Sequence, residues 1–331
     1  MAPSELNPRQ MLAIFLGASS YRRAPKLAQG RAFYNSAQDL YEYLTHPDGL
    51  GLSRENVNWL FDDTRSPGDQ LADIQDFLED RLAALKNEGL PALDLIVYYV
   101  GHGAFSGGDN AYCLAVRTTD ERAEGLTSIR IADLASVIKN SARFLRKFLI
   151  LDCCFSATAY KEFQSGPLTA SRVQLLEELP RRGTTLLCSA SAHDPARAPK
   201  NLSHTIFSEA LLEALRQGHP LFGPRLSLSE LGDLVKDTIH KTYSDSGVRP
   251  EVLSPDQREG DVAGVPLFPN PAYLAEAAEQ ARREAEAQKA REEAVAREKA
   301  EAERRAREAV NNHSKIPHFY HLKFPHLVLG V

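Results

Sequence analysis

Two adjacent cysteines and a glycine-flanked histidine are the residues of this chain most able to do chemistry. Cys153 and Cys154 follow the apolar run 148–151, and His102 stands directly after the apolar run 95–100 and one glycine. A thiolate is a strong nucleophile, and a nearby imidazole favours that form and can serve as its base. The pattern therefore predicts a cysteine nucleophile paired with His102.

The two apolar runs are predicted to be neighbouring strands. Both are continuous rather than alternating, which is typical of strands buried on both faces of a parallel sheet. Side chains just past the carboxyl ends of parallel strands converge on one edge of the sheet, where ligands bind. We therefore expect His102 and the cysteine pair to meet at that edge.

Glycines on either side of His102 predict a tight turn of the backbone. Gly101 and Gly103 would allow that turn and would leave the Gly103 N–H free to point at a substrate oxygen. An oxyanion hole needs two donors where charge develops, and the candidates are the N–H groups of Gly103 and of the nucleophilic cysteine.

Strands alternate with helices over the first 270 residues. Apolar runs predict further strands at 11–16, 57–61 and 184–190, and a turn signal at 107–110 predicts a hairpin. Helical spacing of apolar residues predicts helices over 35–45, 69–85, 131–141, 205–217 and 227–243. The alternation predicts an α/β domain with a mainly parallel sheet and helices on both faces.

The composition changes abruptly after about Pro271. Residues 272–310 are almost entirely Ala, Glu, Arg, Lys and Gln, with Glu and Arg paired at i,i+4 spacing. Coiled-coil seam positions are mostly Ala, so we expect a solvated helical arm that associates weakly. The apolar tail 311–331 is too short to form a core. It is expected to dock on the body, to contact a partner or to begin a further element.

Charge and cysteine usage restrict the class of protein. A formal net charge of −5 over 331 residues gives no support to nucleic acid or a membrane surface as the main partner. No apolar stretch reaches about 18 residues, so no membrane span is expected. The four cysteines form no CxxC pair and the N-terminus lacks a signal-peptide pattern, so we expect a cytoplasmic protein with free thiols.

The motifs resemble those of the caspase-like clan of cysteine proteases, in particular its metacaspase and bacterial orthocaspase branch. Residues 99–103 read Tyr-Val-Gly-His-Gly and residues 152–157 read Asp-Cys-Cys-Phe-Ser-Ala, where the family has Ser-Gly-His-Gly and Asp-x-Cys-x-Ser-Gly. The resemblance covers roughly residues 10–270 and implies a three-layer sandwich with cysteine endopeptidase activity. Aligned on Asp152, it places the nucleophile at Cys154 and the base at His102, and leaves Cys153 as a packing neighbour.

The resemblance also implies an acidic pocket that binds Arg or Lys before the scissile bond. The matching acids are Asp39 and Asp152, because carboxylates bind cations through charge-assisted hydrogen bonds. Ser189, at the end of the fifth strand, is a further candidate for this pocket. Arg31 leaves open a preference for acidic residues, as in animal caspases. The pocket shape also stays open, because the chain departs from the family pattern at Val100, Phe155 and Ala157.

Further expectations follow from the same resemblance. The connection 157–183 suggests self-cleavage at Arg181 or Arg182, and members of this branch are often placed in defence or programmed-death modules. No cofactor is required, although an acidic group keeps calcium open as an alternative: Asp62, Asp63, Asp69 and Asp73. Expected partners are protein or peptide substrates with basic residues, and a regulatory protein or a second copy through the arm. A catalytically silent scaffold that acts through the arm is the alternative from another class.

Overall fold

A computed structural model describes residues 7–27, 30–106, 111–155, 183–191, 202–254 and 260–313. For residues 154, 155, 190, 191 and 309–313 it describes the backbone alone. The chain divides into two compact units, Met1–Leu274 and Ala275–Val331.

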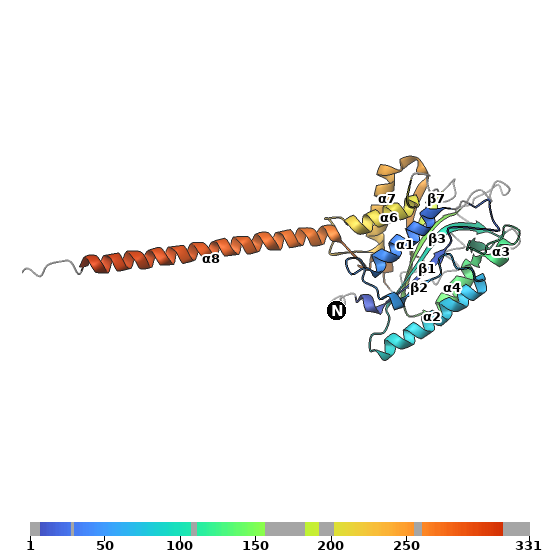
Figure 1. Ribbon diagram of the computed structural model, residues 1–331, viewed down its shortest axis with the longest axis horizontal. Coiled ribbons are helices and arrows are strands. Elements are labelled where there is room, and N and C mark those ends of the chain that lie inside the picture. Colours follow the sequence, from blue (N-terminus) through green and yellow to red (C-terminus); the bar gives the residue numbers. More distant parts are fainter. Residues whose placement is uncertain are drawn as a thin grey trace, which may run out of the picture. The chain divides into compact units, whose positions relative to one another are not determined.

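The first unit is built on a sheet with the strand order β2-β1-β3-β6-β7-β9 (Figure 1). Its strands are β1 (Met11–Gly17), β2 (Val57–Trp59), β3 (Asp94–Phe105), β6 (Arg146–Phe155), β7 (Thr184–Ser191) and β9 (Val248–Leu253). The strands pair in parallel except β9, which runs antiparallel to β7. This confirms the mainly parallel sheet. The sequence missed β9, because Pro250 and the charged residues beside it break the apolar pattern of a buried strand.

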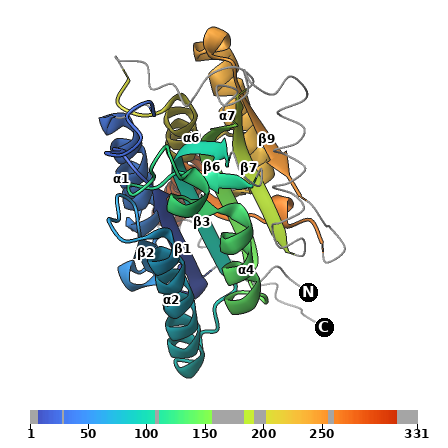
Figure 2. The same ribbon diagram turned by 90° about the vertical axis from the view of Figure 1, so that its right-hand side faces the viewer.

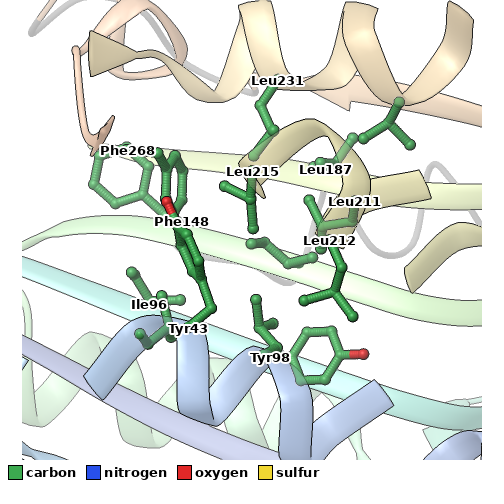
Figure 3. Close-up of a cluster of buried hydrophobic side chains, with 14 of the residues drawn as sticks. Tyr43, Ile96, Tyr98, Phe148, Leu187, Leu211, Leu212, Leu215, Leu231 and Phe268 are labelled. Atoms are coloured by element: carbon green, nitrogen blue, oxygen red, sulfur yellow. The ribbon is translucent and has the colours of Figure 1, made fainter. Parts of the chain in front are cut away.

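Helices cover both faces of this sheet (Figures 1 and 2). One face carries α1 (Arg31–Thr45), α6 (Ile206–Gln217) and α7 (Leu228–Thr242), and the other carries α2 (Pro67–Asn87) and α4 (Ile131–Ser141). Successive strand residues alternate between two cores, so Tyr98 packs with α1 and α6 whereas Tyr99 packs with α2 and α4. Figure 3 shows part of the first core, where Phe148, Leu211 and Leu215 converge. The three-layer sandwich is thereby confirmed.

Short elements complete the unit. They are β4 (Tyr112–Leu114), β5 (Ile129–Arg130), β8 (Arg225–Leu226), β10 (Phe268–Pro269) and α3 (Glu124–Thr127). Helix α7 starts with a capping box, in which Ser227 and Glu230 satisfy each other's backbone donors. The start of α1 differs from the prediction, because the helix begins at Arg31 and already buries Ala32 and Phe33.

Strands β3 and β6 are longer than predicted, and this changes where the reactive residues lie. The predicted hairpin exists, since β4 pairs antiparallel with β3 from Gly103↔Leu114 to Phe105↔Tyr112, although its turn at 107–110 lies outside the described residues. Pairing with β4 and β6 keeps the backbone extended beyond Val100. The predicted tight turn around His102 is therefore wrong, and both His102 and Cys154 lie within strands rather than past their ends.

The second unit holds most of α8 (Pro271–His313), which confirms the predicted helical arm. Every side chain from 275 to 308 is exposed. Ion pairs at i,i+4 spacing join Arg305 to Glu301 at 2.7 Å and Arg283 to Glu279. Across the described ranges, no helix combines the length and apolar character needed to cross a membrane. Most of the apolar tail, residues 314–331, lies outside those ranges.

Candidate active site

His102 and Cys154 are Cα partners in the parallel pairing of β3 with β6. Neighbouring strands of a sheet lie about 4.8 Å apart, so this register brings the two residues as close as separate strands allow. Positions 102, 152 and 154 belong to the same face, because side chains alternate along each strand and Tyr98 and Ile150 pack on that face. The predicted base and nucleophile positions therefore meet on the face that carries α1 and α6.

Cys153 belongs to the opposite face. Its side chain is fully buried in the core beneath α2 and α4, and its sulfur lies 3.5 Å from the Tyr112 hydroxyl. Burial raises the pKa of the Cys153 thiol to about 12, which keeps it protonated and unreactive at neutral pH. Cys153 is thus a packing residue, and of the two cysteine positions only 154 is in register with His102.

His102 is buried and held from several directions. Its imidazole lies between the rings of Tyr21 and Phe33, each with a centroid 5.5 Å away in an edge-to-face arrangement. The Tyr99 hydroxyl lies 2.7 Å from the His102 carbonyl oxygen and 2.8 Å from that of Ala115, and donates to them. The backbone of His102 also hydrogen-bonds the Tyr21 hydroxyl. These contacts fix the histidine before any substrate binds.

Gly101 is required by a close approach. A Cβ atom at Gly101 would lie 2.7 Å from the Tyr99 hydroxyl oxygen and 2.8 Å from that of Tyr21. The absence of a side chain therefore lets both hydroxyls reach the backbone of His102. Gly103 pairs with Leu114 in β4 and with Phe155 in β6. The role of its N–H in an oxyanion hole stays a prediction.

Asp152 is buried beside the start of α6. One of its carboxylate oxygens accepts hydrogen bonds from the hydroxyls of Thr205 and Ser208, the latter at 2.5 Å. The Tyr98 hydroxyl lies 2.6 Å from Ser208, so it can donate in turn. Burial raises the pKa of Asp152 to about 6, although the two hydroxyls favour the ionised form. Within the described residues, no cationic side chain contacts this carboxylate.

Asp39 has different surroundings. One of its carboxylate oxygens lies 3.1 Å from His204 Nε2 and 3.2 Å from an Arg216 guanidinium nitrogen, and the side chain is 30% exposed. Ser189 is buried in β7, opposite Pro250 of β9 and on the face of Asp152. Asp152 therefore lies on the strand of Cys154 and the face of His102, whereas Asp39 already contacts His204 and Arg216.

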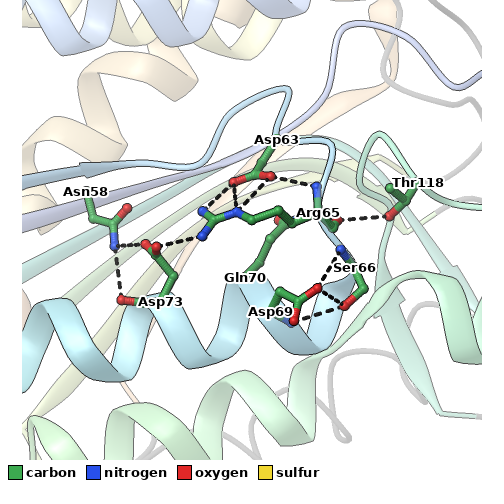
Figure 4. A network of polar contacts seen from close by, with 8 residues as sticks. All are labelled: Asn58, Asp63, Arg65, Ser66, Asp69, Gln70, Asp73 and Thr118. Atoms are coloured by element: carbon green, nitrogen blue, oxygen red, sulfur yellow. Dashed lines mark hydrogen bonds and ion pairs between the residues drawn. The ribbon is translucent and has the colours of Figure 1, made fainter.

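The acidic residues considered for calcium are engaged with other parts of the protein, as Figure 4 shows for Asp63, Asp69 and Asp73. Arg65 binds Asp63 at 2.6 Å and Asp73 at 2.8 Å. Asp69 caps α2 through Ser66, while Asp62 accepts from Ser19 and pairs with Arg117. The described part of the chain contains no group of three or more His, Cys, Asp and Glu side chains able to hold a metal.

Two further predictions concern arginines. Arg181 and Arg182, the expected self-cleavage residues, lie outside the described residues. Arg31 is exposed in the first turn of α1. Neither prediction is tested by the geometry of the site.

Sequence reasoning missed the residues that surround the predicted ones. They are Tyr21, Phe33 and Tyr99 around His102, Thr205 and Ser208 on Asp152, and His204 on Asp39. Thr205 had a local signal, because a threonine directly before a helical pattern is a typical N-cap. Tyr99 lies three residues before His102 on the same strand, and the remaining residues depend on contacts between segments distant in sequence, which no local pattern indicates.

A three-layer α/β sandwich in which a histidine and a cysteine are paired across adjacent parallel strands is typical of a cysteine-dependent hydrolase. Residues 12–259 match the family model described as the caspase domain. The chain therefore belongs to the caspase domain family and is a cysteine-type endopeptidase. No curated protein matches the chain significantly.

Proposed function

We propose that this endopeptidase cleaves after Arg or Lys and uses Cys154 and His102 as a catalytic dyad, as in the metacaspase and orthocaspase branch. The observation that carries the proposal is the register pair His102↔Cys154, with the buried acid Asp152 two positions before Cys154 on the same face. One strand thus supplies the nucleophile and a negative charge for substrate recognition.

The proposed reaction has two stages. The Cys154 thiolate attacks the carbonyl carbon of the scissile bond, and the N–H groups of Gly103 and Cys154 stabilise the oxyanion. Protonated His102 gives its proton to the leaving amine, which leaves a thioester on Cys154. His102 then takes a proton from water, the resulting hydroxide attacks the thioester, and the acid product leaves as the thiolate reforms. This chemistry requires no metal or cofactor.

The proposed preference for a basic residue rests on Asp152. A buried carboxylate without a cationic partner is costly, and an Arg or Lys side chain would relieve that cost by forming an ion pair. Ser189 is proposed to line the same pocket, because it lies on the same face of the neighbouring strand. Asp39 was the second expected acid of this pocket, and its contacts suggest a different role that is developed below.

The arm and the biological setting belong to the same proposal. The exposed surface of α8 suits a regulatory partner or weak self-association. A role in a bacterial defence or programmed-death module is proposed from the family alone.

A panel of fluorogenic peptides tests this function. Peptides that differ only in Arg, Lys, Asp or neutral citrulline before the scissile bond are compared with the full chain and with Cys154→Ala. Cleavage of Arg and Lys peptides that is lost in Cys154→Ala supports the proposal. Faster cleavage after Asp would support the alternative based on Arg31, and no cleavage of any peptide would support the silent scaffold.

A further inference from the structure

His204 lies between two carboxylates just before α6. Its Nε2 is 3.1 Å from Asp39, and its Nδ1 hydrogen-bonds Glu209. Both ring nitrogens of His204 thus face a carboxylate oxygen. The Arg216 guanidinium lies 3.2 Å from Asp39. We call this cluster the His204 clamp (Asp39, His204, Glu209 and Arg216).

Helix α1 holds the segment before α6 at three consecutive residues. Asn35 Nδ2 donates to the Ser203 carbonyl at 2.8 Å, Asp39 binds His204, and Ser36 Oγ accepts from the Thr205 N–H at 3.2 Å. Asn35, Ser36 and Asp39 lie on neighbouring positions of one helical face. The backbone position of Thr205 is thus determined from α1.

Thr205 connects this segment to Asp152. Its hydroxyl donates to the Asp152 carboxylate and also caps α6 by accepting from the Ser208 N–H at 3.3 Å. A shift of the chain at His204 would move this hydroxyl away from Asp152. The orientation of the buried acid consequently depends on contacts made by its neighbour in sequence.

We propose that the His204 clamp is a positioning unit that fixes the Thr205 hydroxyl on Asp152, and that Asp39 acts through this clamp rather than by contacting the charge of the substrate. Asp39 is already bound by His204 and Arg216, so a substrate cation would have to displace them. Asp152 has hydroxyl donors and no cation among the described residues. This inference rests on the proposed preference for Arg or Lys.

The first test compares Asp39→Asn with Asp152→Asn in the full chain. The readout is the ratio of kcat/KM for an Arg peptide to that for its citrulline counterpart, which isolates the substrate charge. Asparagine keeps an acceptor for His204, so Asp39→Asn is expected to retain the ratio within about threefold. Asp152→Asn is expected to lower it by about tenfold or more, the range for a lost charged partner. Equal losses in both variants would overturn the assignment.

The second test asks whether the clamp acts through Thr205. The groups around the Asp152 carboxylate are Tyr98 from β3 and the hydroxyls of Thr205 and Ser208 at the start of α6, and the Cys153 thiol on the opposite face of the same strand interacts with it electrostatically. Loss of the Thr205 hydrogen bond disfavours the carboxylate, so the pH at which the Arg-to-citrulline ratio is half-maximal should rise by about one unit in Thr205→Val.

Clamp variants should reproduce the effect of Thr205→Val. Asp39→Ala and His204→Ala are also expected to raise the pH at which the Arg-to-citrulline ratio is half-maximal. Glu42→Gln serves as the control, because Glu42 is exposed on α1 and contacts Gln38 outside the clamp. An unchanged midpoint in both clamp variants would contradict the inference.

A stability measurement separates this inference from the proposed function. The difference in unfolding free energy between the parent and Asp152→Asn reports the Asp152 titration without any substrate. In an Asp39→Ala background, the pH at which this difference levels off should rise by about one unit, whatever the substrate preference. A protein that does not prefer Arg over citrulline would refute the proposed function, and an unmoved titration would refute the clamp.

Discussion

His102 and Cys154 are partners across two adjacent parallel strands, and Cys153 is excluded from that pairing by strand alternation. Of the two adjacent cysteine positions, only 154 is therefore in register with His102. The same alternation places Asp152 with Cys154 and buries Cys153 among apolar side chains.

Removing the Tyr99 hydroxyl should impair catalysis through His102. Tyr99→Phe removes a buried hydroxyl that donates to the carbonyls of His102 and Ala115, so we expect unfolding to become easier by about 1–2 kcal/mol. We also expect kcat to fall severalfold with KM little changed. Steady-state kinetics and urea unfolding measure both effects.

Tyr43→Phe is the matched control for this substitution. The Tyr43 hydroxyl is buried without a hydrogen-bond partner among the described residues, so its loss should leave activity unchanged and stability equal or higher. A loss of kcat in Tyr43→Phe as large as in Tyr99→Phe would show that the effect is not specific to His102.

Gly101→Ala should destabilise the protein and misplace His102. The added methyl would overlap the hydroxyls of Tyr21 and Tyr99, and overpacking of this kind costs about 1–3 kcal/mol. Combining Gly101→Ala with Tyr21→Phe removes one of the clashes and should recover part of the stability. Additive losses in the double variant would argue against the close approach as the cause.

Asp152 makes stability depend on pH. Its pKa rises from 3.8 to about 6 on folding, so its contribution is fully present below pH 4 and is lost as pH rises towards 6 and above. Asp152→Asn should therefore gain stability relative to the parent across that window, by up to about 3 kcal/mol. Thermal unfolding between pH 4 and pH 8 checks this, and a constant difference between the two proteins would rule it out.

The arm should be helical by itself. A peptide spanning residues 271–313 has a high alanine content and several i,i+4 ion pairs, which stabilise helices without tertiary contacts. Circular dichroism should show a mostly helical peptide at low temperature, with a modest loss in high salt. A spectrum typical of a disordered chain would contradict this account of α8.

Sequence patterns were informative where local physics decides the structure. The capping box at Ser227, the apolar run of β3 and the charged repeat of α8 each contain their own signal. The extension of β3 through His102 depends on pairing with β4 and β6, so the glycines there suggested a turn instead. A glycine that permits close approach and one that permits a turn look alike in sequence.

The residues of the candidate site were likewise predictable only in part. His102 and the Asp-Cys-Cys segment could be found from motifs at predicted strand ends. The surroundings of Asp39 could not, because His204 just before α6 and Arg216 within it are far away in sequence. Asp39 and Asp152 therefore looked equivalent in the sequence, although Asp39 contacts His204 and Arg216 whereas Asp152 contacts hydroxyls.

Covalent labelling tests the central claim most directly. An arginyl chloromethylketone binds as a basic substrate and alkylates the attacking thiolate, and peptide mapping identifies the modified cysteine. We predict that Cys154 is labelled in the parent and in Cys153→Ala, and that Cys154→Ala is not labelled. Labelling that persists in Cys154→Ala, or that falls on Cys153 in the parent, would contradict the assignment.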